Sequence, residues 1–543
     1  MRALYSPDRL PVRIIASGAA IMLGLWLLAS VFRPFEAKTW ADRADLVRNA
    51  FVHAYNGYRR QAFGHDEVRP VSGKTADTFN AWAVSAVDGL DTMWLMGLED
   101  MFTEAVDLVS QQTWSMPDKK AAPFFETTIR YLGGLLGAYA LSKVEHINDV
   151  LLYNSSHADG LYPSAFDLGS GVGRNFHFSA GAAADSAYEY LLKQWLVSGR
   201  SEGRVRDHYV HSANAILANL AYVSPSRGLL YVTDAIRKPS DPDVKSPNTD
   251  ADMQAASPYY LRDTAIARGR PSHNFEHLTC FLGGLLALGA RAVPEVDGRA
   301  VTSTPAGNLT RSALNLPHPT FTPHDRQLHM WAAEGLAETC WATYADMPSG
   351  LGPDGVAMAL RMHDLKVLRM HELKALRTHD LKVLRMRGLK ALRMRDLKAW
   401  HKPPGARRVE PIPADAENRA QALDYRVRSN SWLLRPETIE SIYLLWRTTG
   451  DPVWRERGWR LFQSMERWCR AEYGYSVVSQ INTDHPRMTD EQPSWLFAET
   501  FKYLFLLFTD EDLLPLDQWV FNTEAHPLPV FEWRGWEREA YGI

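Results

Sequence analysis

Helical periodicity is the feature of this 543-residue sequence that most restricts its fold. In six long segments, apolar residues recur at i, i+3 and i+4, the spacing that places them on one face of an α-helix. Convincing runs of alternating strand are few. The sequence therefore predicts an all-α fold class with helices in pairs. The six segments are residues 82–101, 126–142, 185–197, 277–290, 437–448 and 495–508.

The N-terminal region predicts a membrane anchor. Residues 14–32 read IIASGAAIMLGLWLLASVF and contain no charge. At about 1.5 Å per residue this run spans roughly the 30 Å hydrocarbon core of a bilayer. A cleaved signal peptide or a buried helix are the alternatives. A signal peptide has a shorter apolar core and a small-residue cleavage site, which favours an uncleaved signal anchor here.

The flanking charges predict a single-pass type II topology. Three arginines precede the apolar run, so residues 1–13 are expected to stay cytosolic and the rest of the chain to enter the lumen. Residues 33–44 are then a short stem, and residues 45–535 form the lumenal domain. The sequons at Asn154 and Asn308 agree with this location, although such triplets are common by chance.

An octapeptide repeated five times fills residues 360–399, where 12 Lys and Arg stand against four Asp and Glu. Eight residues turn an α-helix about 80° beyond two full turns, so the leucines cannot form one apolar stripe. The repeated histidines likewise do not converge on a metal. We interpret this segment as an inserted expansion. With it set aside, the chain is acidic overall, and nothing in it indicates nucleic-acid binding.

Aromatic and cysteine contents leave alternatives open. Aromatic residues make up 11% of the chain, which fits either a large core or a site where rings stack on sugars. The three cysteines, Cys280, Cys340 and Cys469, have no zinc-ribbon spacing. One disulfide and a spare thiol are compatible with an oxidising compartment.

Seven segments together resemble the class I α-mannosidases of glycoside hydrolase family 47. They occur in the order found in that family and extend from about residue 45 to residue 530. The last one, WLFAETFKYLFLLFTDEDLLPLDQWVFNTEAHPLPV, is highly specific. The others are AFGHDEVRPVSG (62–73), AVDGLDTMWLMGL (86–98), FETTIRYLGGLLGAY (125–139), ADSAYEYLLKQWL (184–196), HLTCFLGGLLALGA (277–290) and WLLRPETIESIYLLWRTTGDPVW (432–454).

The resemblance implies an (α/α)7 barrel closed at one mouth by a small C-terminal β-hairpin. It also implies hydrolysis of terminal α1,2-linked mannose from high-mannose N-glycans with inversion, by a calcium-dependent monomer in the endoplasmic reticulum or Golgi membrane.

Three carboxylates match the catalytic positions of the family. An inverting glycosidase needs one carboxyl group as acid and another as base, far enough apart to admit a water. Glu126 matches the proposed acid, and Arg130 lies one helical turn later, where it can orient it. Glu437 matches the proposed base. Pro436 fits the first position of a helix, whose positive end would favour ionised Glu437. Asp185 matches a third carboxylate, an alternative acid or an electrostatic stabiliser.

The resemblance also implies a calcium ion bound by Thr523 through its hydroxyl and carbonyl oxygens. Glu440, Glu499 and Glu524 match carboxylates that hold calcium-bound waters. It implies a disulfide between Cys280 and Cys340. The positions that match substrate-binding residues are Arg130, His277, Arg435, Trp495 and Glu499.

The sequence departs from the family in four places. About one helical pair is missing after residue 142, so the barrel is expected to be one pair short. Ala183 replaces an arginine found in the reticulum enzymes, which makes the chain more similar to the Golgi type. Glu276 occupies a position that we interpret as one of substrate specificity. The fourth departure is the octapeptide insertion.

These departures leave two alternatives to an active enzyme. One is a catalytically inactive protein that binds glycans in quality control, and the other is a non-functional copy. The sequence does not distinguish Golgi from reticulum, the order of mannose removal, or Glu126 from Asp185 as the acid.

Overall fold

The computed structural model describes residues 39–115, 122, 126–132, 160–165, 177–182, 184–224, 226–236, 270–295, 321–358 and 408–541. The predicted anchor at 14–32, the octapeptide insertion, both sequons, Ala183 and most of the segment around the expected missing pair lie outside these residues. In the part of the chain that is described, no helix is both long enough and apolar enough to cross a membrane.

The described residues are dominated by helices, as the periodicity predicts. The α-helices are α2 (Trp40–Gln61), α3 (Val84–Leu95), α4 (Glu99–Ser110), α8 (Asp185–Val197), α9 (Gly203–Asn219), α11 (Phe281–Ala292), α12 (Pro323–Ala345), α15 (Arg419–Ala422), α16 (Glu437–Thr449), α17 (Val453–Trp468), α18 (Phe501–Phe508) and α19 (Gly535–Tyr541). Three tighter or wider helical turns are η1 (Thr127–Leu132), η3 (His277–Cys280) and η4 (Leu496–Thr500).

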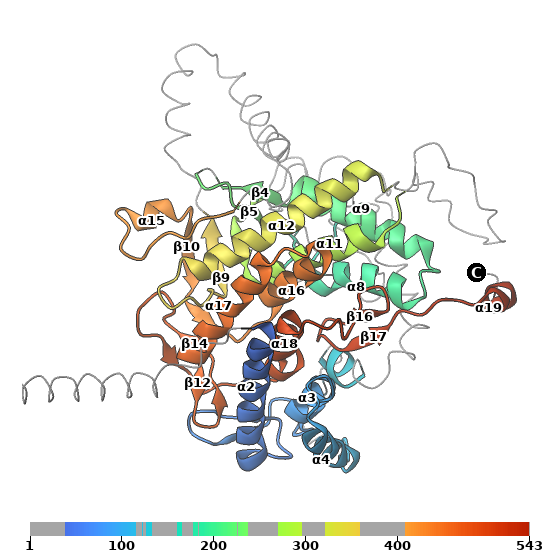
Figure 1. Ribbon diagram of the computed structural model, residues 1–543. Helices are drawn as coiled ribbons and strands as arrows, with labels where there is room; N and C mark the ends of the chain where they lie inside the picture. The colour runs from blue at the N-terminus through green and yellow to red at the C-terminus, as the bar shows by residue number, and fades with distance from the viewer. Residues whose placement is uncertain are drawn as a thin grey trace, which may run out of the picture.

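The helices pack in consecutive pairs, which confirms the predicted arrangement. The pairs are α3 with α4, α8 with α9, α11 with α12, and α16 with α17. Near the start of the chain, α2 packs against α18, which lies near its end, so these distant segments lie side by side (Figure 1).

Two long helices that the periodicity did not predict begin with capping boxes. Thr39 Oγ1 accepts the Asp42 N–H at 3.1 Å, and the Asp42 carboxylate accepts the Thr39 N–H at 2.9 Å. Thr322 and Asp325 repeat this exchange at the start of α12, with Pro323 in the first turn. Each box satisfies two backbone donors that the first helical turn leaves free.

The prediction of one helix over residues 82–101 is wrong. Helix α3 ends at Leu95 and α4 begins at Glu99, because Gly97 adopts a left-handed conformation with φ of 66°. The predicted helices at 126–142 and 495–508 begin as the π-helical turns η1 and η4. Such wide turns often occur at functional sites, and these two carry Arg130 and Glu499.

The strands are short, and every pairing among those described is antiparallel. They are β1 (Glu67–Val68), β2 (Thr75–Ala76), β3 (His177–Phe178), β4 (Ala221–Val223), β5 (Leu230–Val232), β6 (Ala235–Ile236), β7 (Arg270–Pro271), β8 (Asn274–Glu276), β9 (Gly355–Met358), β10 (Tyr425–Ser429), β11 (Ser431–Trp432), β12 (Arg470–Ala471), β13 (Gly474–Tyr475), β14 (Val478–Ser479), β15 (Arg487–Met488), β16 (Trp519–Phe521) and β17 (Pro527–Pro529).

The β16–β17 hairpin corresponds to the predicted C-terminal hairpin. It contacts α8, and Phe521 lies 6.0 Å from the Tyr443 ring of α16 and 5.4 Å from the Tyr503 ring of α18. Its connecting turn, residues 522–526, is therefore held between helices that lie far apart in the sequence. We call these five residues the hairpin turn.

Helices α11 and α16 approach each other closely at Gly284. A Cβ atom on Gly284 of α11 would lie 2.7 Å from Leu444 Cδ1 and 3.1 Å from Ser441 Cα of α16. A larger residue at this position would therefore require its neighbours on α16 to shift. The Ser441 hydroxyl accepts the Gly284 N–H at 2.6 Å, so the contact is also hydrogen-bonded.

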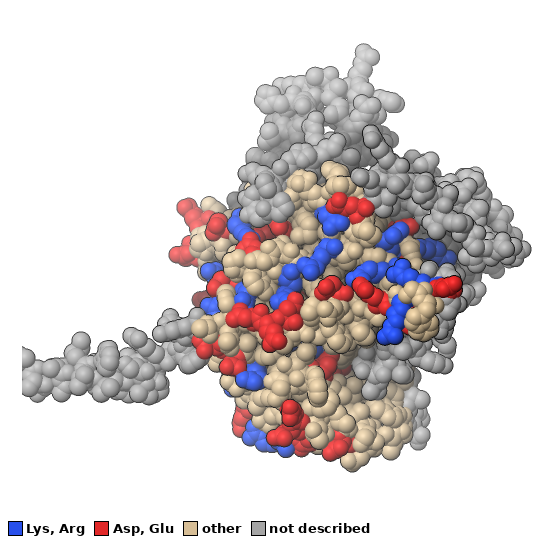
Figure 2. All heavy atoms as spheres, turned by 45° about the vertical axis from the view of Figure 1, so that its right-hand side comes forward, with Lys and Arg blue, Asp and Glu red and all other residues tan. Residues whose placement is uncertain are grey.

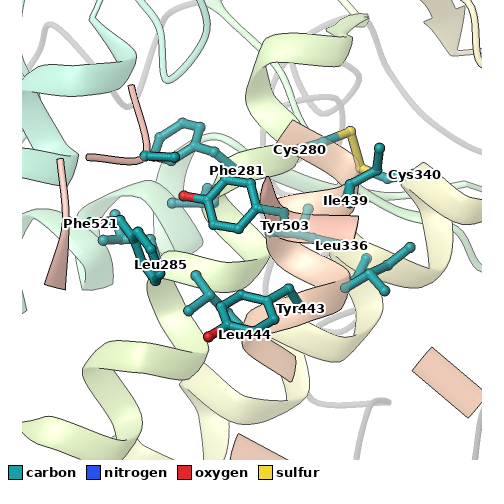
Figure 3. Close-up of a cluster of buried hydrophobic side chains, with 14 of the residues drawn as sticks. Cys280, Phe281, Leu285, Leu336, Cys340, Ile439, Tyr443, Leu444, Tyr503 and Phe521 are labelled. Carbon is teal, nitrogen blue, oxygen red and sulfur yellow. A yellow bond between two sulfur atoms is a disulfide. The ribbon is translucent and has the colours of Figure 1, made fainter. Parts of the chain in front are cut away.

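The predicted disulfide between Cys280 and Cys340 is confirmed. Its Cα atoms lie 6.0 Å apart, and it joins η3, at the start of α11, to α12. Figure 3 shows the bridge beside Ile439 of α16, at the edge of the apolar cluster. Cys469 is a free, buried thiol.

Charged side chains of both signs are interspersed on the face drawn in Figure 2. The described residues of that face carry no extended field of one sign.

Removing the disulfide should destabilise the protein without changing its fold. The bridge closes a separation of 60 residues, for which the chain-entropy estimate is about 4 kcal/mol. We expect Cys280→Ser with Cys340→Ser to lower the free energy of unfolding by about 2–4 kcal/mol in urea titrations. Cys469→Ala is the control for loss of a buried thiol. An unchanged midpoint for the double variant would contradict the expectation.

Candidate active site

Arg130 lies at the centre of a buried ion cluster that joins three parts of the chain. Its side chain, in η1, is 4% exposed. Nε donates to Glu126 Oε2 at 2.9 Å, and Nη1 donates to Asp88 Oδ2 at 3.0 Å and to Glu524 Oε2 at 2.6 Å. Asp88 belongs to α3 and Glu524 to the hairpin turn. The guanidinium of Arg130 therefore links η1 to α3 and to the hairpin turn. The predicted i,i+4 contact between Glu126 and Arg130 is confirmed.

Glu437 is the first residue of α16, which confirms its predicted place in the first helical turn. Pro436, which was predicted at the first helical position, lies instead at the N-cap. His277 Nδ1 lies 2.9 Å from Glu437 Oε2, and Arg435 Nη1 lies 3.7 Å from Oε1. Burial alone would raise the pKa of Glu437. The hydrogen bond and charge of His277, together with the Arg435 charge, outweigh burial and lower that pKa. The structure therefore favours ionised Glu437.

His277 is itself held by a chain of hydrogen-bonding side chains. Its Nε2 lies 2.6 Å from the Tyr344 hydroxyl and 3.1 Å from Thr438 Oγ1. The Trp432 indole N–H donates to the Tyr344 hydroxyl at 2.8 Å. These contacts fix the plane of the imidazole ring, so Nδ1 stays directed at Glu437.

Asp185 begins α8 and has the opposite electrostatic character. Burial, together with the charges of Glu189, Glu437 and Glu276, raises its pKa to about 6, against the effect of one hydrogen bond from the Ser186 N–H. Asp185 is thus poised to hold a proton near neutral pH, whereas Glu437 is not.

Glu276 reaches the backbone just before Asp185. Its Oε2 accepts the Ala182 N–H at 3.1 Å, and a Cβ atom on Gly181 would lie 2.6 Å from the same oxygen. Glu276 ends strand β8 and is followed directly by His277. Glu276 therefore contacts the segment before Asp185, and the next residue, His277, contacts the side chain of Glu437.

The indole ring of Trp495 lies close to two guanidinium groups. Its indole N–H donates to the Leu433 carbonyl at 3.1 Å. Arg435 and Arg130 lie 5.6 Å and 5.9 Å from its ring centroid. Arg435 is fixed in turn by Asp354, which accepts its Nε–H at 2.9 Å.

Three buried carboxylates lie around the hairpin turn that carries Thr523. Burial raises the pKa of Glu440 to about 8 and that of Glu524 to about 8, and it raises the pKa of Glu499 well above its usual range. Repulsion from neighbouring carboxylates contributes to these raised values, against the lowering effect of the Lys193 and Arg130 charges. This part of the site holds more acidic groups than the nearby Arg and Lys side chains neutralise.

A metal at this position would depend on other ligands besides these carboxylates. Among the described residues, no three His, Cys, Asp or Glu side chains are arranged to hold a metal ion directly. No donor in the described part of the chain hydrogen-bonds to the Thr523 hydroxyl or carbonyl oxygen. Those two oxygens and the surrounding acidic groups are compatible with a hard cation bound largely through water.

Sequence reasoning did not single out five residues that contribute to this site. Asp88 and Asp91 lie in a segment that was recognised only by its resemblance. Lys193 follows Asp185 by eight residues within an apolar helix, where a charged residue is a detectable signal of a buried ion pair. Lys502 gives the same signal in α18, whereas nothing in the sequence indicates Tyr344.

Comparison with known proteins agrees with this geometry. The sequence profile of Glycosyl hydrolase family 47 matches residues 50–155 and 142–530. Mannosyl-oligosaccharide alpha-1,2-mannosidase IA of Drosophila melanogaster is 28% identical, over 92% of this chain and 69% of the relative. The endoplasmic reticulum mannosyl-oligosaccharide 1,2-alpha-mannosidase of Homo sapiens is 29% identical, over 89% of this chain and 64% of the relative. The chain thus spans about two thirds of the length of these relatives.

A solved structure shares the fold. The alpha-1,2-mannosidase from Trichoderma reesei matches with a TM-score of 0.60 and 21% identity, over 90% of this chain and 99% of that one. This similarity confirms the predicted (α/α)7 barrel fold. The two stretches matched by the family profile meet at residues 142–155, where the sequence predicts a missing helical pair, and that deletion stays a prediction.

Loss of Arg130 should cost far more stability than loss of a surface arginine. Removing one partner of a buried ion pair costs about 3–5 kcal/mol, because the other charge is left unpaired. We expect this loss for Arg130→Met in urea titrations at pH 7. Arg48→Met, which breaks the exposed pair with Asp45, is the matched control. Equal losses for the two variants would contradict the buried cluster.

Proposed function

The chain belongs to glycosyl hydrolase family 47, and on that basis we propose that it hydrolyses terminal α1,2-linked mannose from high-mannose N-glycans with inversion. The names of its relatives support this substrate and a place in the secretory pathway. The observation that carries the proposal is the contrast between two carboxylates in one site. His277 and Arg435 keep Glu437 ionised, whereas burial leaves Asp185 able to hold a proton.

Glu437 is proposed as the base that takes a proton from the attacking water. The lowered pKa and the fixed His277 contact suit it to this role. The opposite carboxyl group must protonate the departing sugar oxygen. Glu126, anchored by Arg130, and Asp185, with a pKa of about 6, are both candidates. Trp495 is proposed to lie against the sugar ring, and Arg435 and His277 to border the same subsite.

Calcium is proposed as the cofactor. The residues present fit it, because Thr523 offers two oxygens and Glu440, Glu499 and Glu524 supply acidic groups that can hold waters around a cation. When bound, calcium would supply coordination of sugar hydroxyls and so favour one orientation of the terminal mannose. The excess of buried acid described above supports this assignment.

Residues 45–535 are proposed to be the catalytic domain of a monomeric, single-pass type II protein of the reticulum or Golgi membrane. The uncharged run at 14–32 supports the anchor. The Cys280–Cys340 bridge supports an oxidising compartment.

A direct assay tests the activity. We would secrete residues 40–543, incubate them with a Man9-type glycan, and follow the products by mass spectrometry. We expect stepwise loss of mannose, abolished by chelator and lowered at least about 10²-fold by Glu437→Gln. The exposed Glu417→Gln is the control. A soluble protein that binds the glycan without cleaving it would instead support the inactive glycan-binding alternative.

Substrates with different leaving groups should identify the acid. The fluoride ion of a mannosyl fluoride can depart without being protonated. The departing sugar oxygen of a disaccharide needs a proton from the acid. Loss of the true acid, by Glu126→Gln or Asp185→Asn, should lower kcat/KM on the α1,2-disaccharide by about 10²-fold or more and spare the fluoride. If both variants lose both activities equally, neither residue acts as the acid in this way.

The pH profile should report the His277–Glu437 contact. Because His277 helps to lower the pKa of Glu437, His277→Ala should raise that pKa. Glu437 must be ionised to act as a base, so the acidic limb of kcat/KM should move to higher pH. His485→Ala, at an exposed position, is the control. An acidic limb that stays in place would show that another group sets it.

A further inference from the structure

We infer that Lys193 and Lys502 form a clamp that fixes the hairpin turn in the conformation needed to bind a cation, so that Thr523 is preorganised before any metal arrives. The inference rests on the proposed calcium site and adds two positioning residues to it. Neither lysine is among the residues that the sequence assigned to the site.

Lys193 holds the first residue of the hairpin turn. Its side chain, in α8, is 6% exposed. Nζ donates to the Asn522 carbonyl at 3.2 Å and also pairs with Glu189, one helical turn earlier. Glu440 lies 3.9 Å from the same nitrogen.

Lys502 holds the other end of the hairpin turn. Its side chain, in α18, is fully buried. Nζ donates to the Ala525 carbonyl at 2.7 Å and to Asp91 Oδ2 at 2.9 Å. His526 Nδ1 lies 3.0 Å from the same Asp91 oxygen. Two ammonium groups from different helices therefore donate hydrogen bonds to backbone carbonyls on either side of Thr523.

Peptide planarity carries the effect of Lys193 to Thr523. The Asn522 carbonyl and the Thr523 N–H belong to one rigid peptide unit, so holding the oxygen also restricts the orientation of Thr523. The Asn522 side chain completes the arrangement, since its Oδ1 accepts the N–H groups of Glu524 and His526 at 2.9 Å and 2.8 Å. Ala525 adopts a left-handed φ of 56°, a conformation that costs energy in a residue with a Cβ.

The pattern of satisfied and free oxygens distinguishes a clamp from general packing. Both lysines donate to flanking carbonyls, and within the described residues neither they nor other donors bond to the Thr523 oxygens. Burying an ammonium group is costly unless it is paired and hydrogen-bonded. A hairpin held only for stability could be fixed by apolar contacts such as those of Phe521. Two buried lysines instead neutralise nearby acid while leaving the Thr523 oxygens available to a cation.

Calcium binding to the secreted domain tests the clamp. We would titrate Ca²⁺ by calorimetry into the wild type, Lys193→Met and Lys502→Met, with exposed Lys74→Met as the matched control for loss of one positive charge. We expect the wild type and the control to bind with the same Kd, and each clamp variant to bind at least tenfold more weakly. At saturating Ca²⁺ the variants should recover kcat. An unchanged Kd in variants that merely have a lower Tm would overturn the clamp. Failure of the wild type to bind Ca²⁺ would instead overturn the proposed cofactor.

A second measurement needs no variant and covers the case in which the methionine substitutions do not fold. Hydrogen exchange of the wild type would be followed by mass spectrometry over a peptide containing the hairpin turn, with chelator and with Ca²⁺. A clamp that acts before metal binding predicts strong protection of the turn amides in chelator, with little further gain from Ca²⁺. Protection that arises only with Ca²⁺ would overturn the inference.

Discussion

The pairing of buried charge around the hairpin turn is the constraint on which the rest of this structure depends. Arg130, Lys193 and Lys502 come from three different helical segments, and each donates a hydrogen bond to a residue of the turn. Because an unpaired buried charge is costly, these contacts can form only when the paired helices are correctly closed around the hairpin. The same ionic contacts that join these helical segments to the hairpin therefore also fix the geometry of the site.

The carboxylates of the site differ in function because they differ in surroundings. Glu437 has His277 and Arg435 beside it, so it stays ionised despite burial. Asp185 is buried and has other carboxylates beside it, so its pKa rises although one backbone N–H opposes the change. Around the hairpin turn, acid exceeds base, which is the electrostatic condition that a cation relieves. A glycosidase that uses a base, an acid and a metal needs these three environments.

Local periodicity predicted the helical pairing, and the family resemblance implied the hairpin and the disulfide that the structure contains. The roles that the resemblance implies for the main carboxylates stay predictions. Sequence patterns missed what depends on distant contacts. Lys193 meets Asn522 across 329 positions of sequence. Apolar periodicity did not predict helix α17, because Arg455 and Arg457 occupy its buried face. Those arginines are accommodated by stacking, with Arg455 4.1 Å from the Trp40 ring and Arg457 4.8 Å from the Trp454 ring. A hydropathy pattern cannot show that stacking on tryptophan rings offsets the cost of burying these arginines.

The central claim is that Glu437 activates a water molecule as a base and does not form a covalent bond to the sugar. The stereochemistry of the first product tests this claim most directly. Proton NMR spectra recorded within the first turnovers on an α1,2-mannobiose would show the anomer released before mutarotation. The account predicts β-mannose first, since a base-activated water attacks the face opposite the leaving group. Initial release of α-mannose would contradict it, because retention requires a covalent intermediate and a different role for Glu437.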